Sequence, residues 1–78
     1  MRRRERRLIV AFYTTHDAMA FEEYCLARGA AGRLIPLPRA ISAGCGLAWS
    51  APPDDEAGLR ELLAGAGIAP QHLRELEI

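Results

Sequence analysis

The residues with the strongest potential for chemistry surround Cys45. Gly44 and Gly46 flank this cysteine, and because they have no side chains they leave room for a reagent to reach the sulfur. Arg39 supplies positive charge and Ser42 a hydroxyl, and cationic groups and hydrogen-bond donors favour the nucleophilic thiolate. We therefore expect a reactive, partly exposed thiol. The same residues also allow inert packing, since free cysteine often serves as a small buried hydrophobe.

The other candidate ligands and nucleophiles do not form a second motif. Cys25 falls on the apolar side of an expected helix, which predicts a packing role. The two cysteines form no CxxC pair and are too few for a disulfide framework. Together with His16 and His72 they lack the spacing of zinc ligands. We expect no metal and no cofactor.

Composition restricts the partners of this 78-residue chain, which carries ten arginines, ten acids and no net charge. A neutral domain has no overall field that attracts a polyanion. Five arginines fall within residues 1–7, which predicts a flexible, solvated tail before a single domain over 8–78. A nucleic-acid contact by this tail is the weaker alternative. No apolar run is long enough to cross a membrane, and the cytoplasm is the expected location.

The hydrophobic pattern and the turn residues predict the elements that would position these residues. They are a strand over 8–13, a helix over 17–28, a strand over 33–37, a strand over 45–50 and a helix opened by the acids 54–56. Residues 71–78 could form a strand or a helical turn, and we favour a strand because the first strand needs a partner in the sheet. The prolines at 36 and 38 restrict the second strand to a sheet edge. Residues 38–44 form the loop before the third strand.

This order predicts an α+β fold, the ferredoxin-like βαββαβ sandwich, with an antiparallel sheet of order 4-1-3-2. Two right-handed crossovers place both helices on one face of the sheet. The connectivity brings the first helix and the loop before the third strand to the same end of the sheet. We expect Cys45, Thr15 and His16 to approach one another there, with His72 nearby.

The central segment, LIPLPRAISAGCGLA from Leu34 to Ala48, resembles the signature of a family of small bacterial selenium/sulfur carrier-like proteins. The motif positions are Pro36, Pro38, Arg39, Ser42, Cys45 and Gly46. The resemblance implies that Cys45 holds sulfur or selenium as a persulfide or selenosulfide and passes it to a partner protein. The Arg-rich start and the Pro52-Pro53 pair depart from the pattern expected of the family.

Two functions therefore compete. One is a chalcogen carrier whose partners are donor and acceptor proteins. Such a carrier is not an enzyme that turns over substrate. The other is a non-catalytic interaction or regulatory module, dimeric, in which Cys45 is structural. A contrast in reactivity between Cys45 and Cys25 separates the two.

Overall fold

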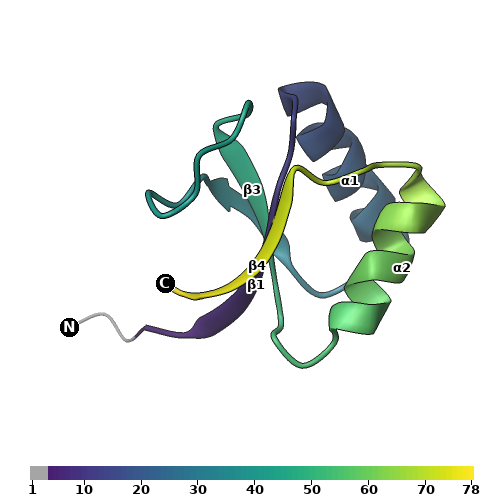
Figure 1. Ribbon diagram of the computed structural model, residues 1–78. Helices are drawn as coiled ribbons and strands as arrows, with labels where there is room; N and C mark the ends of the chain where they lie inside the picture. The colour runs from purple at the N-terminus through teal and green to yellow at the C-terminus, as the bar shows by residue number, and fades with distance from the viewer. Residues whose placement is uncertain (1–3) are drawn as a thin grey trace.

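A computed structural model describes residues 4–78 of the chain, and its six elements follow the predicted order (Figure 1). They are β1 (Arg6–Ala11), α1 (Thr15–Ala27), β2 (Arg33–Pro36), β3 (Leu47–Ala51), α2 (Glu56–Ala66) and β4 (His72–Glu77). All three strand pairs are antiparallel, and the sheet order is β2-β3-β1-β4. This is the predicted order read from the opposite edge, and β2 lies at an edge as its prolines predict.

The first strand begins earlier than the sequence predicts. Arg6 and Arg7, which we expected in the tail, pair with Glu77 and Leu76 of β4. Glu5 and Ile78 then exchange two backbone hydrogen bonds of 2.9 Å. Pairing with the full length of β4 supplies partners for these backbone groups, which explains the earlier start; the strand also ends earlier, at Ala11 rather than at residue 13. The remainder of the expected tail, residues 1–3, lies outside the described residues.

The helices begin at side-chain caps. Thr14 accepts a hydrogen bond of 3.0 Å from the Asp17 N–H, so α1 begins two residues before the predicted start. Asp55 accepts one of 3.1 Å from the Gly58 N–H at the start of α2. The acids expected to open the second helix therefore act as its cap and first turn.

The sheet has apolar side chains on both faces. Both helices cover one face (Figure 1), where Phe21 packs edge-on against the buried Trp49. On the other face, Ile9 and Ala48 form a second cluster with Ile41 from the connection between β2 and β3. This connection, residues 37–46, is called the cover loop below. Because Ile41 anchors it in an apolar cluster, the cover loop has a defined place on the sheet.

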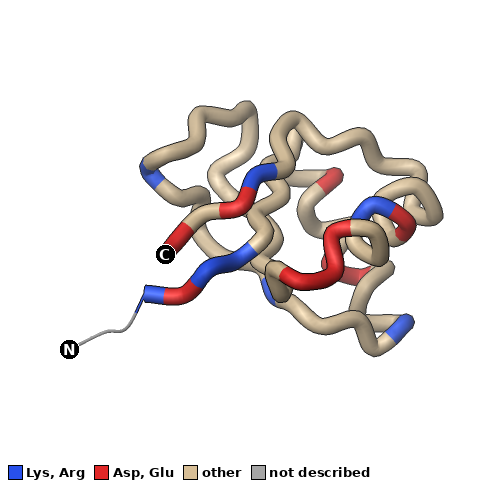
Figure 2. The backbone as a smooth tube through the Cα atoms, turned by 60° about the horizontal axis from the view of Figure 1, so that its bottom comes forward, with Lys and Arg blue, Asp and Glu red and all other residues tan. Residues whose placement is uncertain are grey.

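Charges are distributed unevenly between the two layers (Figure 2). The helical segments 12–32 and 52–71 contain seven acids and two arginines. The other described residues, 4–11, 33–51 and 72–78, contain six arginines and three glutamates. The net charge of zero therefore combines an acidic helical layer with a basic remainder.

Candidate functional site

Cys45 lies near the end of the cover loop, two residues before β3. Its Sγ accepts a hydrogen bond from the Leu47 N–H at 3.3 Å and lies 3.6 Å from Thr15 Oγ1. Thr15 is the first residue of α1. The structure thus brings together two of the residues that the connectivity predicted to meet.

Both neighbours of the sulfur can stabilise negative charge. The Leu47 N–H donates, and the Thr15 hydroxyl can either donate to Sγ or accept from it. A thiolate would accept from both groups, while the start of α1 adds a partial positive charge nearby. The arrangement therefore suits both forms of the sulfur: the Thr15 hydroxyl can donate to a thiolate, and it can accept from a thiol.

Burial of Cys45 contradicts the expectation of a partly exposed thiol. Only 2% of its surface is exposed, and its side chain joins the core cluster that includes Val10, Phe12 and Ala18. The cause is the path of the cover loop, which turns the cysteine toward the helices rather than toward solvent. A reagent can reach this sulfur only when the loop moves.

The two glycines beside Cys45 have different roles. A Cβ added at Gly44 would lie 2.5 Å from the Tyr13 carbonyl oxygen, so the absence of a side chain permits close backbone packing. A Cβ added at Gly46 would meet no atom within 4 Å. The expectation that both glycines leave room for a reagent is therefore wrong for Gly44, whose space is already filled.

The segment before β4 holds the cover loop in place. Gln71 Oε1 accepts a hydrogen bond of 2.9 Å from the Gly44 N–H. His72 Nε2 lies 3.0 Å from the Ser42 carbonyl oxygen, and because a carbonyl only accepts, this nitrogen carries the hydrogen. Sequence reasoning placed His72 near the site but missed Gln71. The available signal was its position as the first residue of the predicted last strand, whose start the topology brings to this end of the sheet.

Other predicted site residues form no hydrogen bond with the sulfur of Cys45. His16 and Arg39 are exposed, and within residues 4–78 neither takes part in a side-chain hydrogen bond or ion pair. Ser42 contributes its carbonyl to the His72 contact. The groups that bond to Sγ are instead Thr15 and the Leu47 backbone. Supporting roles for Arg39, Ser42 and His16 stay predictions.

Cys25 differs from Cys45 in its surroundings. It is fully buried on α1, and burial raises the pKa of its thiol to about 11, against a smaller opposing effect of Arg28. The packing role predicted for Cys25 is confirmed by this placement.

The described residues form neither a metal site nor a membrane-spanning helix. Among residues 4–78, no three His, Cys, Asp or Glu side chains are grouped so that they could hold a metal ion. None of the helices in this part of the chain has the length and apolar character needed to span a membrane.

Comparison with known proteins gives one match. A family model described as "Putative Se/S carrier protein-like" matches residues 7–75. No curated protein and no solved structure gives a significant match.

Proposed function

This chain belongs to the Se/S carrier protein-like family, and we propose that it carries sulfur or selenium on Cys45 and delivers it to a partner protein. The observation that supports this most directly is the pair of polar groups at Sγ, the Leu47 N–H and the Thr15 hydroxyl. We further infer a ferredoxin-like fold class from the βαββαβ order and the sheet order. The reducing cytoplasm is the compartment in which such a free thiol would persist.

Loading and delivery are two thiol exchanges without net oxidation. The Cys45 thiolate attacks the outer sulfur of a donor persulfide, R–S–SH, forming Cys45–S–SH and releasing R–S⁻. An acceptor thiolate then attacks the outer sulfur of Cys45–S–SH, takes it as its own persulfide and regenerates the Cys45 thiolate. Selenium follows the same route with an outer selenium atom.

The absence of a nearby second thiol suits this sequence of steps. Both cysteines are free, and Cys25 is buried in the core on α1. An internal resolving cysteine would attack the inner sulfur, form a disulfide with Cys45 and release the outer sulfur as hydrosulfide, so the cargo would be lost. With Cys25 held in α1, the cargo stays until an external thiol arrives.

Opening of the cover loop is a required step because Cys45 is only 2% exposed. The Gln71–Gly44 hydrogen bond opposes that opening. Replacing Gln71 with Ala should raise the rate of Cys45 alkylation by about threefold to tenfold, the ratio expected for one lost hydrogen bond. Gln71→Glu retains an acceptor oxygen and serves as the matched control, with a smaller effect. Equal rates in the wild type and Gln71→Ala would exclude this bond as a restraint.

The central test is sulfur loading. Treatment with a persulfide donor, followed by intact-mass measurement and peptide mapping, should show an adduct of about 32 Da on Cys45, the mass of one added sulfur. Cys45→Ser should remain unmodified, and Cys25→Ala should load normally. Addition of an acceptor thiol should then remove the adduct and transfer it. Loading on neither cysteine, or equally on both in the folded protein, would refute the carrier function.

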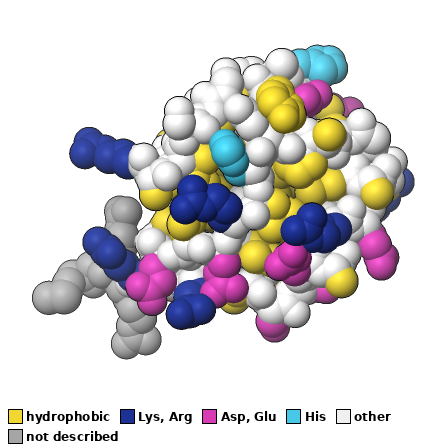
Figure 3. All heavy atoms as spheres, in the orientation of Figure 1, with side chains coloured by type: hydrophobic (Ala, Val, Ile, Leu, Met, Phe, Trp, Pro, Cys, Tyr) yellow, Lys and Arg dark blue, Asp and Glu magenta, His cyan; other side chains and the backbone are white. Residues whose placement is uncertain are grey.

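A second candidate function, an interaction module, is favoured by the outer edge of β4. This strand ends the sheet, and apolar side chains are visible on both sides of it (Figure 3). Partner strands commonly add to such an edge. Sedimentation at increasing concentration tests for self-association, and a dimer whose Cys45 takes up no sulfur would support this function over the first.

A further inference from the structure

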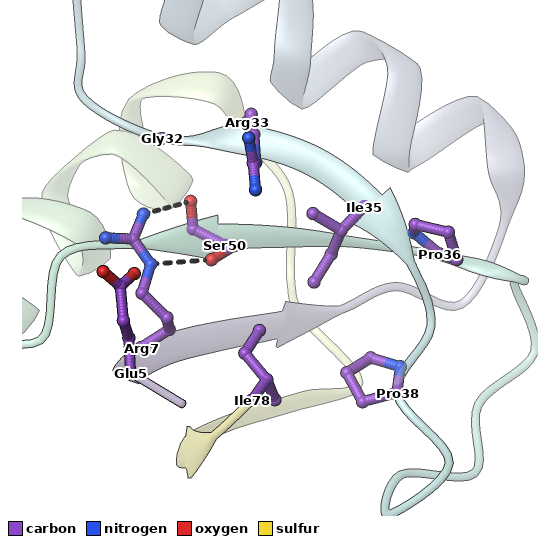
Figure 4. A pocket seen from close by; sticks show the side chains of 9 residues that line it. All are labelled: Glu5, Arg7, Gly32, Arg33, Ile35, Pro36, Pro38, Ser50 and Ile78. Carbon is purple, nitrogen blue, oxygen red and sulfur yellow. Dashed lines mark hydrogen bonds between the residues drawn. The ribbon is translucent and has the colours of Figure 1, made fainter. Parts of the chain in front are cut away.

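A groove on the sheet face opposite the helices lies apart from Cys45. It has a volume of about 920 Å³, within the range typical of small-molecule sites. Figure 4 shows Arg7, Arg33 and Ser50 at one end, and Ile35, Ile78 and Pro38 toward the other. The groove therefore has a polar end and an apolar end.

The polar end is organised around Ser50, which is only 3% exposed. Arg7 donates from Nε to Ser50 Oγ at 2.9 Å and from Nη2 to the Ser50 carbonyl oxygen at 3.3 Å. These two bonds fix the position and orientation of the Arg7 guanidinium. Since Oγ accepts from Arg7, the hydroxyl hydrogen of Ser50 remains available for a ligand.

Arg33 adds a second guanidinium. It is paired directly across from Ser50 in the β2–β3 register, so both side chains lie on the groove face. Within the described part of the chain, Arg33 has no hydrogen-bonded or ionic partner. Its five N–H donors are therefore free for a bound anion.

Strand alternation gives this face an excess of positive charge. Arg74 is paired with Ile9, which places it on the groove face, while Glu75 and Glu77 occupy the other face. Glu5 is the one acid among the residues that line the groove; Figure 4 shows its carboxylate beside Arg7. It offsets part of the positive charge and leaves Arg33 uncompensated.

From this arrangement, we propose that the groove binds a small organic acid, a carboxylate attached to an apolar group. The carboxylate would accept hydrogen bonds from Arg33 and the Ser50 hydroxyl, and charge-assisted bonds of this kind are the strong ones. The apolar group would lie against Ile35, Pro38 and Ile78. Neither Cys45 nor its bonding partners line this site, so the bound acid would not touch the sulfur.

The test uses 4-phenylbutyrate as the probe, with binding followed by amide chemical-shift changes in NMR spectra of the full chain. Saturable shifts at Arg33, Ile35, Ser50 and Ile78 are expected. The neutral analogue 4-phenylbutanol and the short anion acetate should each bind at least about tenfold more weakly, since each lacks one of the two contacts. Equal binding of the alcohol, or no saturable shifts with the acid, would overturn the proposal.

A charge-matched pair of variants then locates the site. Arg33→Gln should weaken 4-phenylbutyrate binding by about tenfold through loss of a charge-assisted hydrogen bond. Arg60→Gln removes the same charge from α2, where Arg60 pairs with Glu56 at the exposed surface, and should leave binding unchanged. Equal loss in both variants would mean that only net charge matters, and the groove would be excluded as the site. Unchanged binding in Arg33→Gln would overturn the assignment of Arg33.

Discussion

At Cys45, the sulfur accepts a hydrogen bond from a backbone N–H at 3.3 Å and lies 3.6 Å from a threonine hydroxyl. Cys25 is enclosed by apolar side chains, and burial raises the pKa of its thiol. Both side chains therefore belong to the apolar core, but among the described residues Cys45 has two polar partners at its sulfur and Cys25 has no hydrogen-bond partner at its own. Reactivity should follow these surroundings, because the thiolate is the nucleophile.

The Thr15 hydroxyl can be tested by its effect on sulfur uptake. Thr15→Val preserves the shape of the side chain but removes the only side-chain partner of the Cys45 sulfur among the described residues. The rate at which Cys45 takes up sulfur from a persulfide donor should fall by about threefold or more, because the attacking sulfur loses a hydrogen-bond donor. Intact-mass time courses in a Cys25→Ala background measure this rate. Thr15→Ser retains the hydroxyl and should behave like the parent; a loss equal to that in Thr15→Val would point to packing instead.

The raised pKa of Cys25 predicts a pH dependence of stability. Its thiol ionises near 9.0 when unfolded and near 11 when folded, so between these values the unfolded chain loses its proton first. The free energy of unfolding should therefore fall as pH rises from about 9 to about 11, by about 2 kcal/mol at most. Urea titrations at several pH values measure this change. Cys25→Ala should show a smaller fall over the same window, and an identical fall in both proteins would contradict the assignment.

At the level of elements, the cover loop joins the two apolar clusters of the fold. Ile41 packs into the cluster beneath the loop, and Cys45 packs into the cluster beside the helices. Between them, Gly44 approaches the Tyr13 backbone and bonds to Gln71. The position of the sulfur thus depends on how closely this one loop packs against the end of β1.

Substitutions at the two glycines test that dependence. Gly44→Ala would introduce a Cβ 2.5 Å from the Tyr13 carbonyl oxygen, which should cost about 1–3 kcal/mol of stability and increase alkylation of Cys45. Gly46→Ala adds the same methyl group where no atom lies within 4 Å, so stability and reactivity should change little. Urea denaturation and peptide-mapped alkylation measure both effects. Equal effects in the two variants would show that the close contact at Gly44 does not hold the loop.

Most of the elements were accessible from the sequence because they have local causes. A continuous apolar run predicted β1, acids and hydroxyls predicted the helix starts, and prolines predicted the edge position of β2. The last strand was predicted from the topology, because β1 needed a partner in the sheet. The burial of Cys45 had no such local signal. It depends on the contact of Gly44 with Tyr13 and on Gln71, which are distant in sequence and meet only after the sheet has formed. For the same reason, the residues that bond to Sγ were only partly predicted.

For the molecule as a whole, the formal charge of zero is an incomplete description. We inferred from it that the domain has no overall field that attracts a polyanion, but the separation of charge between the layers means that each face has a field of its own. The basic face contains Arg7, Arg33 and Arg74, and the acidic layer contains the two helices. The Debye length is about 10 Å at moderate salt. A partner at such a distance therefore interacts mainly with the charges of the nearer layer, and the net charge of the whole molecule matters less.

This separation has a practical consequence in chromatography. A protein with evenly mixed charges passes through both types of ion exchanger near its isoelectric point, which is about 6.7 here. Because most of its acids lie in the helical layer and most of its arginines lie elsewhere, this chain can present either an acidic or a basic side to a charged resin. Retention on both cation and anion exchangers at low ionic strength, with elution from each by modest salt, is the behaviour that follows.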